Sequence, residues 1–356
     1  MPYIIRRLLL IFPTLFFILL VNFGLVQITP GGPIDQMLAR ASGMADGEGL
    51  GGDLFEGQSA SSSDYQGKRG LHQEFIRELE KQYGFDQPPL TRFFKMVRDY
   101  LSLDFGQSYF KQVSVWSLIK EKFPVSLSLG LWSTLLIYLL SIPLGIYKAT
   151  RDGSRFDTIS SITMVFLYAI PSFLFALLLI ILFAGGSYMD WFPLRGLFSS
   201  NLDSLNFGEK VIDYLWHLAL PVSSIVICGF ASVTLLTKNT FIEEIQKQYV
   251  ITARSKGLDR KQILYGHIFR NAILPLVSKF PSAFMTIFFS SNLLIEIIFS
   301  LDGLGWLGYE AALNRDYPVM FGTLYVFTLM SLFLHVAGDL LYRVVDPRID
   351  FERIEK

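Results

Sequence analysis

The sequence predicts an all-α polytopic membrane protein with six transmembrane helices. Of its 356 residues, 51% are hydrophobic and only 17% are charged, whereas a soluble domain has about a quarter charged residues. The apolar residues gather in blocks long enough to cross a bilayer, which takes about 20 residues of helix. The net charge is zero, so the composition indicates no nucleic-acid partner.

Six blocks of the sequence are predicted to span the membrane. The first follows Arg6 and Arg7, but its apolar run is longer than that of a signal peptide and no small-residue cleavage site follows, so we interpret it as a retained span. Proline occurs inside several blocks, where it kinks a helix unless neighbours satisfy the freed carbonyl. The predicted spans are Leu8–Thr29, Val125–Tyr147, Ile159–Ala184, Tyr214–Leu236, Ala272–Phe299 and Val319–Leu341.

The positive charges predict the orientation. Lys and Arg gather after the second span, after the fourth span and in the C-terminal tail, and they are few in the alternate loops. Both termini are therefore predicted to be cytoplasmic. The chain then divides into an N-terminal span (1–29), an outer, periplasmic segment (30–124), a five-helix core (125–345) and a cytoplasmic tail (346–356).

The outer segment has two parts of different composition. Residues 42–70 are rich in Gly and Ser, which predicts a flexible insertion because such a stretch buries too little apolar surface to offset chain entropy. From Leu71 to Gly84, apolar residues recur at helical spacing. A second amphipathic stretch, Leu90–Leu101, places Phe93, Phe94, Val97 and Leu101 along one face. These helices are predicted to cover the outer end of the bundle, either gating the solute pathway or acting as a lid without ligand contacts.

Polar residues form a stripe within the fifth predicted span. Lys279, Ser282, Thr286 and Ser290 recur every three or four residues and therefore share one helical face. Because a polar stripe is costly in lipid, it is predicted to line the solute pathway, with a contact to another subunit as the alternative. Lys279 also lies close enough to the predicted cytoplasmic end to extend its ammonium group into water.

Other polar residues in the spans favour structural roles. His335 and Asp339 lie one turn apart on the last span, but two ligands do not define a metal site, and an ion pair between Asp339 and Arg343 is the favoured interpretation. The single cysteine, Cys228, lies within an apolar block and is interpreted as a small buried hydrophobic residue.

The loop between the fourth and fifth spans, residues 238–271, carries the strongest functional pattern. It begins as a continuation of the fourth helix through Tyr249. The small residues Thr252, Ala253 and Ser255 allow close approach to another surface. Gly257 supplies a backbone turn that other residues resist. Asp259 with Gln262 three residues later predicts a capping box that starts a new helix, and Pro275 begins the next span. The prediction is a helix, an exposed crosspiece and a second helix.

The order of residues in this loop resembles the EAA-type coupling motif of binding-protein-dependent ABC importers, in the form found in the dipeptide/oligopeptide/nickel branch. Ile251 and Thr252 stand where the general motif has Glu and Ala. The residues that carry the resemblance are Tyr249, Thr252-Ala253-Arg254, Lys256-Gly257, Arg270-Asn271-Ala272 and Pro275.

Further landmarks of that branch occur along nearly the whole chain. They are Arg6-Arg7, Pro30-Gly31-Gly32-Pro33, the segments 83–88, 104–108 and 299–305, Arg315-Asp316-Tyr317-Pro318 and Asp346-Pro347-Arg348. Asp302 stands where a proline is commoner. The insertion at 42–70 and Asp350-Phe351-Glu352 resemble the Yej-type peptide and microcin C permeases.

The resemblance implies a type I ABC importer permease fold in a bacterial inner membrane, which imports peptide. Residues Tyr249, Thr252, Ala253, Arg254, Lys256, Gly257 and Leu258 would dock in a groove of a separate ATPase subunit, although the two cations could instead only enforce topology. A second homologous permease and a periplasmic solute-binding protein would complete the system. The chain has no Gly-x-x-x-x-Gly-Lys-Ser/Thr loop, so we expect no enzyme activity and no cofactor here, with ATP and Mg²⁺ on the partner.

Three alternatives remain. An ion-coupled secondary transporter would need carboxylates within the membrane, whereas Glu296 and Asp339 lie near span ends. An intramembrane enzyme would need a nucleophile and base facing each other, and His217 and His335 have no companions at such spacing. Nickel is an alternative substrate, because the branch includes nickel importers.

Overall fold

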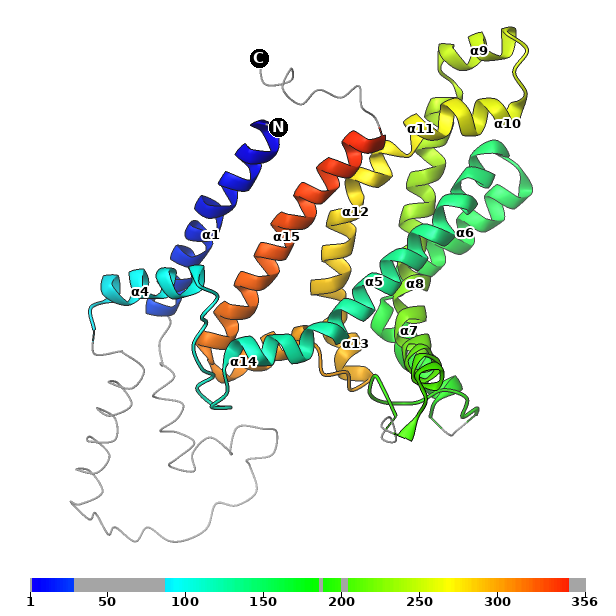
Figure 1. Cartoon of the computed structure of the whole chain (residues 1–356). Coiled ribbons are helices and arrows are strands. Elements are labelled where there is room, and N and C mark those ends of the chain that lie inside the picture. Colours follow the sequence, from blue (N-terminus) through cyan, green and yellow to red (C-terminus); the bar gives the residue numbers. More distant parts are fainter. Residues whose placement is uncertain (1, 29–86, 186–187, 200–203, 346–356) are drawn as a thin grey trace, which may run out of the picture. The chain divides into compact units, whose positions relative to one another are not determined.

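The computed structural model describes residues 2–28, 87–185, 188–199 and 204–345 (Figure 1). In this part of the chain the regular elements are helices, with one isolated bridge between Gln107 and Ser114. Here 5 helices are long and apolar enough to cross a membrane, or up to 6 if a bent pair counts as one span. The predicted all-α architecture is confirmed. The insertion at 42–70, the helix predicted from Leu71 and the tail at 346–356 lie outside the described residues.

The predicted spans follow each other along the chain in the predicted order, but the third is broken and the fourth ends before Tyr249. The helix Leu304–Asn314 was not predicted. The continuous spans are α1 (Pro2–Ile28), α5 (Val115–Thr150), α8 (Phe207–Ile245), α12 with η4 and α13 (Leu274–Thr286, Ile287–Ser291, Asn292–Ile298) and α15 (Tyr317–Val345). The connecting helices are α4 (Pro89–Leu101), α9 (Gln248–Ser255), α10 (Arg260–Ile263), η3 (Leu264–Ile268), α11 (Phe269–Ala272) and α14 (Leu304–Asn314).

The third predicted span, Ile159–Ala184, is not one continuous helix. It consists of α6 (Arg155–Ala169) and α7 (Ser172–Phe183), which meet at an angle of 93°. The break falls at Pro171, and Ile170 before it has the extended backbone that a following proline favours (φ −86°, ψ 122°). Pro13, Pro143, Pro221 and Pro281 remain inside their helices.

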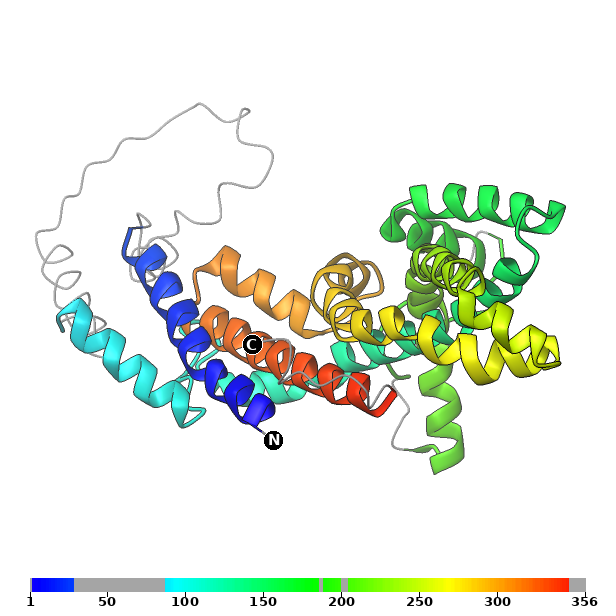
Figure 2. The same cartoon turned by 90° about the horizontal axis from the view of Figure 1, so that it is seen from above.

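The chain forms two compact units, Met1–Ile11 with Lys120–Leu307 and Phe327–Lys356, and Phe12–Ile119 with Gly308–Val326. In the first unit α6 and α7 pack against α8, and Figure 2 shows α6 and α8 side by side. Helices α5 and α8 approach closely at Gly145, where an added Cβ would lie 2.5 Å from the Thr237 Cβ. One apolar core joins residues of α5, α7, α8 and α13.

The second unit is built around α4 and an aromatic cluster. Tyr100 and Phe105 are buried and meet edge to face at 4.9 Å, and the Tyr325 ring lies 5.6 Å from each. The predicted helix at Leu90–Leu101 is confirmed, but its buried side chains are Phe93 and Tyr100, whereas Phe94 and Leu101 are exposed. Of the four residues predicted to share one apolar face, only Phe93 is buried, because the face that includes Tyr100 packs on the aromatic cluster.

Candidate functional site

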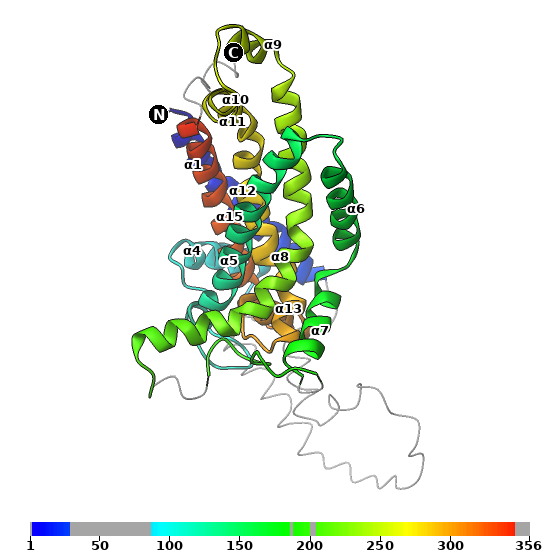
Figure 3. The same cartoon turned by 90° about the vertical axis from the view of Figure 1, so that its right-hand side faces the viewer.

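Helix α9 lies beyond the ends of α5 and α6, after a break in the fourth span (Figure 3). The span ends at Ile245 instead of continuing through Tyr249, and Lys247 is the N-cap of α9. The buried Glu244 secures the break: its carboxylate accepts hydrogen bonds from Lys247 Nζ (2.5 Å) and from Tyr249 Oη (2.7 Å). Burial and this hydrogen bond raise the pKa of Tyr249 to about 12, so the phenol remains a donor at neutral pH.

One face of α9 packs against other helices of the first unit. Val250 and Ala253 are buried in an apolar cluster that also contains Ile146 and Ala149 of α5 and Phe241 of α8. The cluster continues through residues of α10, η3 and α11. The small size of Ala253 therefore serves packing against this chain's own helices rather than the approach to another surface that the sequence predicted.

The turn after α9 needs glycine for its backbone and not for space. Gly257 has φ +82°, and an added Cβ would meet nothing within 4 Å. The Gly257 amide donates to the Arg254 carbonyl (2.9 Å) and the Leu258 amide to the Ala253 carbonyl (3.3 Å), which is the paired pattern of a Schellman cap. The turn prediction for Gly257 is confirmed.

The next helix starts immediately after this cap. The Asp259 amide donates to Gln262 Oε1 (3.1 Å), and the Lys261 amide donates to Asp259 Oδ2 (3.3 Å). The predicted capping box is therefore present, and Pro275 stands in the first turn of α12 as predicted. The crosspiece between α9 and α10 is short and closed by backbone hydrogen bonds at both ends.

The outer face of α9 and the crosspiece are exposed. Ile251 is 53% exposed and Leu258 36%. Thr252, Arg254, Lys256 and Gly257 are exposed as well. Within the part of the chain that the structure describes, Arg254 and Lys256 form no ion pair. The predicted residues thus separate into an exposed set and two inward-facing ones, the half-buried Tyr249 and the buried Ala253.

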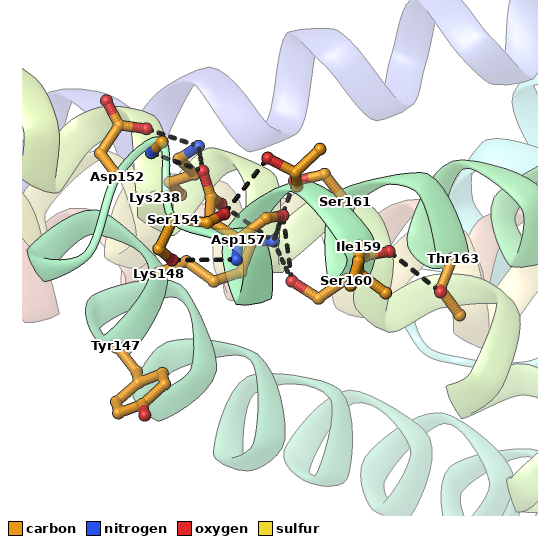
Figure 4. A network of polar contacts seen from close by, with 12 residues as sticks. Tyr147, Lys148, Asp152, Ser154, Asp157, Ile159, Ser160, Ser161, Thr163 and Lys238 are labelled. Atoms are coloured by element: carbon orange, nitrogen blue, oxygen red, sulfur yellow. Dashed lines mark hydrogen bonds and ion pairs between the residues drawn. The ribbon is translucent and has the colours of Figure 1, made fainter.

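A buried polar network ties α6 to α5 and α8 (Figure 4). Asp157 of α6 forms an ion pair with Lys148 of α5 (Nζ to Oδ1, 3.1 Å) and accepts a hydrogen bond from Lys238 of α8 (Nζ to Oδ2, 2.6 Å). Lys148 is fully buried and also donates to Ser160 Oγ (2.5 Å) and Ser161 Oγ (2.9 Å). Lys238 also pairs with Asp152 at 2.8 Å. The ion pairs and hydrogen bonds of this network connect α5, α6 and α8.

A second buried network surrounds Glu296 of α13, which is fully buried. Its carboxylate accepts hydrogen bonds from Ser126 Oγ (2.7 Å) and from the Trp306 amide (2.8 Å), while Ser126 Oγ accepts the Leu304 amide (2.8 Å). These amides belong to the first turn of α14, whose N–H groups have no partner within the helix. Glu296 thus anchors the start of α14.

The predicted pathway stripe is only partly described. Lys279, Ser282 and Thr286 are exposed on α12, and the Thr286 hydroxyl donates to the Ser282 carbonyl (2.9 Å). The side chain of Ser290 lies outside the described residues. Exposure on one chain fits a pathway and a subunit contact equally, so the stripe stays a prediction.

Asp339 forms an ion pair, but its partner in the structure differs from the predicted Arg343. Asp339 pairs with Arg7 of α1, and His335 Nδ1 contacts the Ser331 carbonyl at 2.7 Å. The side chain of Arg343 is not among those described. Among the described residues no group of three or more His, Cys, Asp or Glu side chains could hold a metal ion.

Sequence reasoning missed both buried networks. It counted Lys148 and Lys238 as loop cations and Glu296 as a carboxylate near a span end. A signal was present for the first network, because Asp157 follows Ser154 at capping distance: the Asp157 amide donates to Ser154 Oγ at 3.2 Å. Nothing local in the sequence connects Ser126 with Glu296.

The sequence comparisons identify the family. The model of the family described as "Binding-protein-dependent transport system inner membrane component" matches residues 141–351. The chain belongs to this family. It is 56% identical over 98% of its length to the inner membrane ABC transporter permease protein YejB of Escherichia coli, 99% of which is covered.

Two further relatives are similar over their whole length. The peptidoglycan transport system permease protein YejB of Agrobacterium fabrum is 54% identical, with 99% of this chain and 98% of the relative covered. The oligopeptide transport system permease protein AppB of Bacillus subtilis is 30% identical, with 98% and 99% covered. The chain is therefore an ABC transporter permease, a multi-pass protein of the inner membrane.

Proposed function

We propose that this chain is the permease subunit of an ATP-driven importer of peptides. The relatives that support a peptide substrate are named for peptidoglycan and oligopeptide transport. In the proposed system a periplasmic binding protein delivers the peptide, a second homologous permease completes the pathway, and both termini of this chain face the cytoplasm. The chain itself binds no cofactor, and ATP with Mg²⁺ is bound and hydrolysed on a separate ATPase subunit.

The observation that carries the coupling proposal is the exposed face of α9 and its crosspiece. Ile251 and Leu258 offer apolar contact, and Arg254 and Lys256, which form no ion pair with the described residues, offer positive charge beside it. An apolar centre with polar and charged groups around it is typical of protein interfaces. We infer that Thr252, Arg254, Lys256, Gly257 and Leu258 meet the ATPase, while Tyr249 and Ala253 hold α9 on the spans.

The test compares two glycines that differ only in backbone. Gly257 has φ +82° and Gly266 is helical, and neither has an atom within 4 Å of an added Cβ. Gly257→Ala strains the left-handed turn by about 1–2 kcal/mol, whereas Gly266→Ala suits a helix. Gly257→Pro is a stronger variant, because it also removes the amide that bonds Arg254.

The measurement is co-purification of the ATPase with the tagged permease from its native membrane, followed by ATP-dependent peptide uptake in proteoliposomes. We expect Gly257→Pro to insert normally and to lose the ATPase, Gly257→Ala to retain part of it and Gly266→Ala to retain all of it. Unchanged association in Gly257→Pro would remove the docking claim. Active transport by the single chain without an ATPase would remove the proposed function as a whole.

A further inference from the structure

The second unit contains a cavity of about 410 Å³ that the coupling and transport assignments leave unexplained. Its walls come from α4, from the segment that follows α4, from the end of α1 and from the start of α15. The volume is within the range of about 300–1,000 Å³ typical of small-molecule sites. The cavity is therefore large enough for a small ligand.

Helix α4 presents one regular face to this cavity. Arg92, Lys95, Met96 and Asp99 line it, and their spacing of three and four residues places them in one stripe. Phe93 and Tyr100 of the same helix are buried. The helix thus contributes both the buried Tyr100 and a mostly charged stripe to the cavity.

The cavity is lined by both aromatic rings and polar side chains. Tyr100, Phe105 and Phe321 are buried and line the cavity. The amide side chains of Gln27 and Gln107 also line it. Aromatic rings supply apolar contact area, and amides supply both donors and acceptors for a peptide backbone. This combination suits a ligand with a side chain and peptide bonds.

The α4 stripe carries charges of both signs, and Lys95 and Asp99 do not form an ion pair with each other. Lys95 and Asp99 are at i and i+4, a spacing that allows an ion pair, yet neither makes an ion pair or side-chain hydrogen bond within the described part of the chain. Arg92 lies one turn before Lys95 and donates to Gln27 Oε1 at 3.0 Å. The cavity therefore has a cationic end at residues 92 and 95 and two carboxylates, Asp99 and Asp104, of which Asp104 already accepts the Gly106 amide (3.0 Å).

We propose that this cavity binds a short peptide with free termini, its carboxylate at Lys95 and Arg92 and its ammonium group toward Asp99. The rise of an α-helix, about 1.5 Å per residue, separates positions 92 and 99 by about 10 Å along α4. An extended peptide covers about 3.5 Å per residue, so a ligand of two or three residues fits the stripe. The identity of the ligand as peptide rests on the proposed function.

The direct test measures binding of the tripeptide alanyl-phenylalanyl-alanine to the whole complex in lipid nanodiscs, without ATP and without binding protein. We expect Lys95→Gln and Asp99→Asn each to weaken binding about tenfold, because a hydrogen bond to a charged group contributes about 1.5–3 kcal/mol. Arg98→Gln is the matched control, since Arg98 is exposed on α4 and does not line the cavity.

Blocked peptides assign each end. C-terminal amidation of the tripeptide is expected to weaken binding about tenfold in the parent complex and to have no further effect in Lys95→Gln. N-terminal acetylation is expected to behave in the same way toward Asp99→Asn. Equal binding of free and blocked peptides, or equal effects of Lys95→Gln and Arg98→Gln, would overturn the proposal.

Two outcomes separate this proposal from the proposed function. If ATP-driven peptide uptake proceeds but the nanodisc complex binds no tripeptide, the cavity assignment fails and the importer stands; a loss of binding-protein docking in Lys95→Gln would then assign the cavity to that partner. If the tripeptide binds with the predicted pattern but no ATPase joins the complex, the cavity assignment stands and the importer fails.

Discussion

Asp157 and Glu296 are both buried carboxylates of the first unit, and they are compensated in different ways. Asp157 lies between the ammonium groups of Lys148 and Lys238 and joins three helices. Glu296 has neutral donors around it, the Ser126 hydroxyl and the amide of Trp306. One site depends on matching full charges, and the other depends on hydrogen bonds and a helix terminus, so the same neutral substitution should affect them very differently.

The largest effect is expected from Asp157→Asn. The amide has the shape of the carboxylate but no charge, so the buried Lys148 and the nearly buried Lys238 lose their ion pairs with residue 157. Breaking a buried ion pair costs about 3–5 kcal/mol. The measurement is the thermal unfolding of the purified complex. Asp190→Asn is the control, because Asp190 is exposed and makes no ion pair in the described residues. Equal stability of the two variants would show that the network does not hold α6.

A smaller loss is expected from Gly303→Ala. An added Cβ at Gly303 would lie 2.1 Å from Glu296 Oε1, so the carboxylate must move away from Ser126 and α14. Overpacking of this kind costs about 1–3 kcal/mol. Gly208→Ala is the control, since nothing lies within 4 Å of its added Cβ. Unfolding of both variants at the same temperature would contradict the close packing around Glu296.

The smallest effect is expected from Glu296→Gln. The side-chain oxygen can still accept from Ser126 or the Trp306 amide, and no ion pair is broken, so the expected loss is that of one hydrogen bond, about 1 kcal/mol. Thermal unfolding measured beside Asp157→Asn gives the comparison directly. If Glu296→Gln destabilised the complex as much as Asp157→Asn, the distinction between ion pairing at Asp157 and hydrogen bonding at Glu296 would be wrong.

What the sequence predicted correctly depends on residues close together in the chain. The apolar blocks, the turn at Gly257 and the capping box of Asp259 with Gln262 are local, because the interactions that form them span a few residues. Proline patterns were less informative: Pro171 breaks a span and Pro221 does not. The difference depends on whether neighbouring helices support the interrupted turn, and the sequence of a single span does not contain this information.

Pairings between distant positions could not be predicted in this way. Lys238 meets Asp157, and Ser126 meets Glu296, only after the helices have packed. The structure does explain one of the family resemblances. Ser108 and Asp316 belong to two separate landmark segments, and the Ser108 hydroxyl donates to the Asp316 carboxylate at 2.5 Å. The two motifs are parts of one hydrogen-bonded corner.

The crosspiece after α9 has a mechanical consequence. The amides of Gly257 and Leu258 are bonded in the cap of α9, and the amides of Asp259 and Lys261 are bonded in the capping box of α10. Val250 and Ala253 fix α9 to the ends of α5 and α8. A connection of this kind is rigid, so a displacement of α9 moves the spans and does not extend a flexible loop. In the proposed importer, the conformational change of the ATPase would therefore be transmitted to the transmembrane helices almost without loss of displacement.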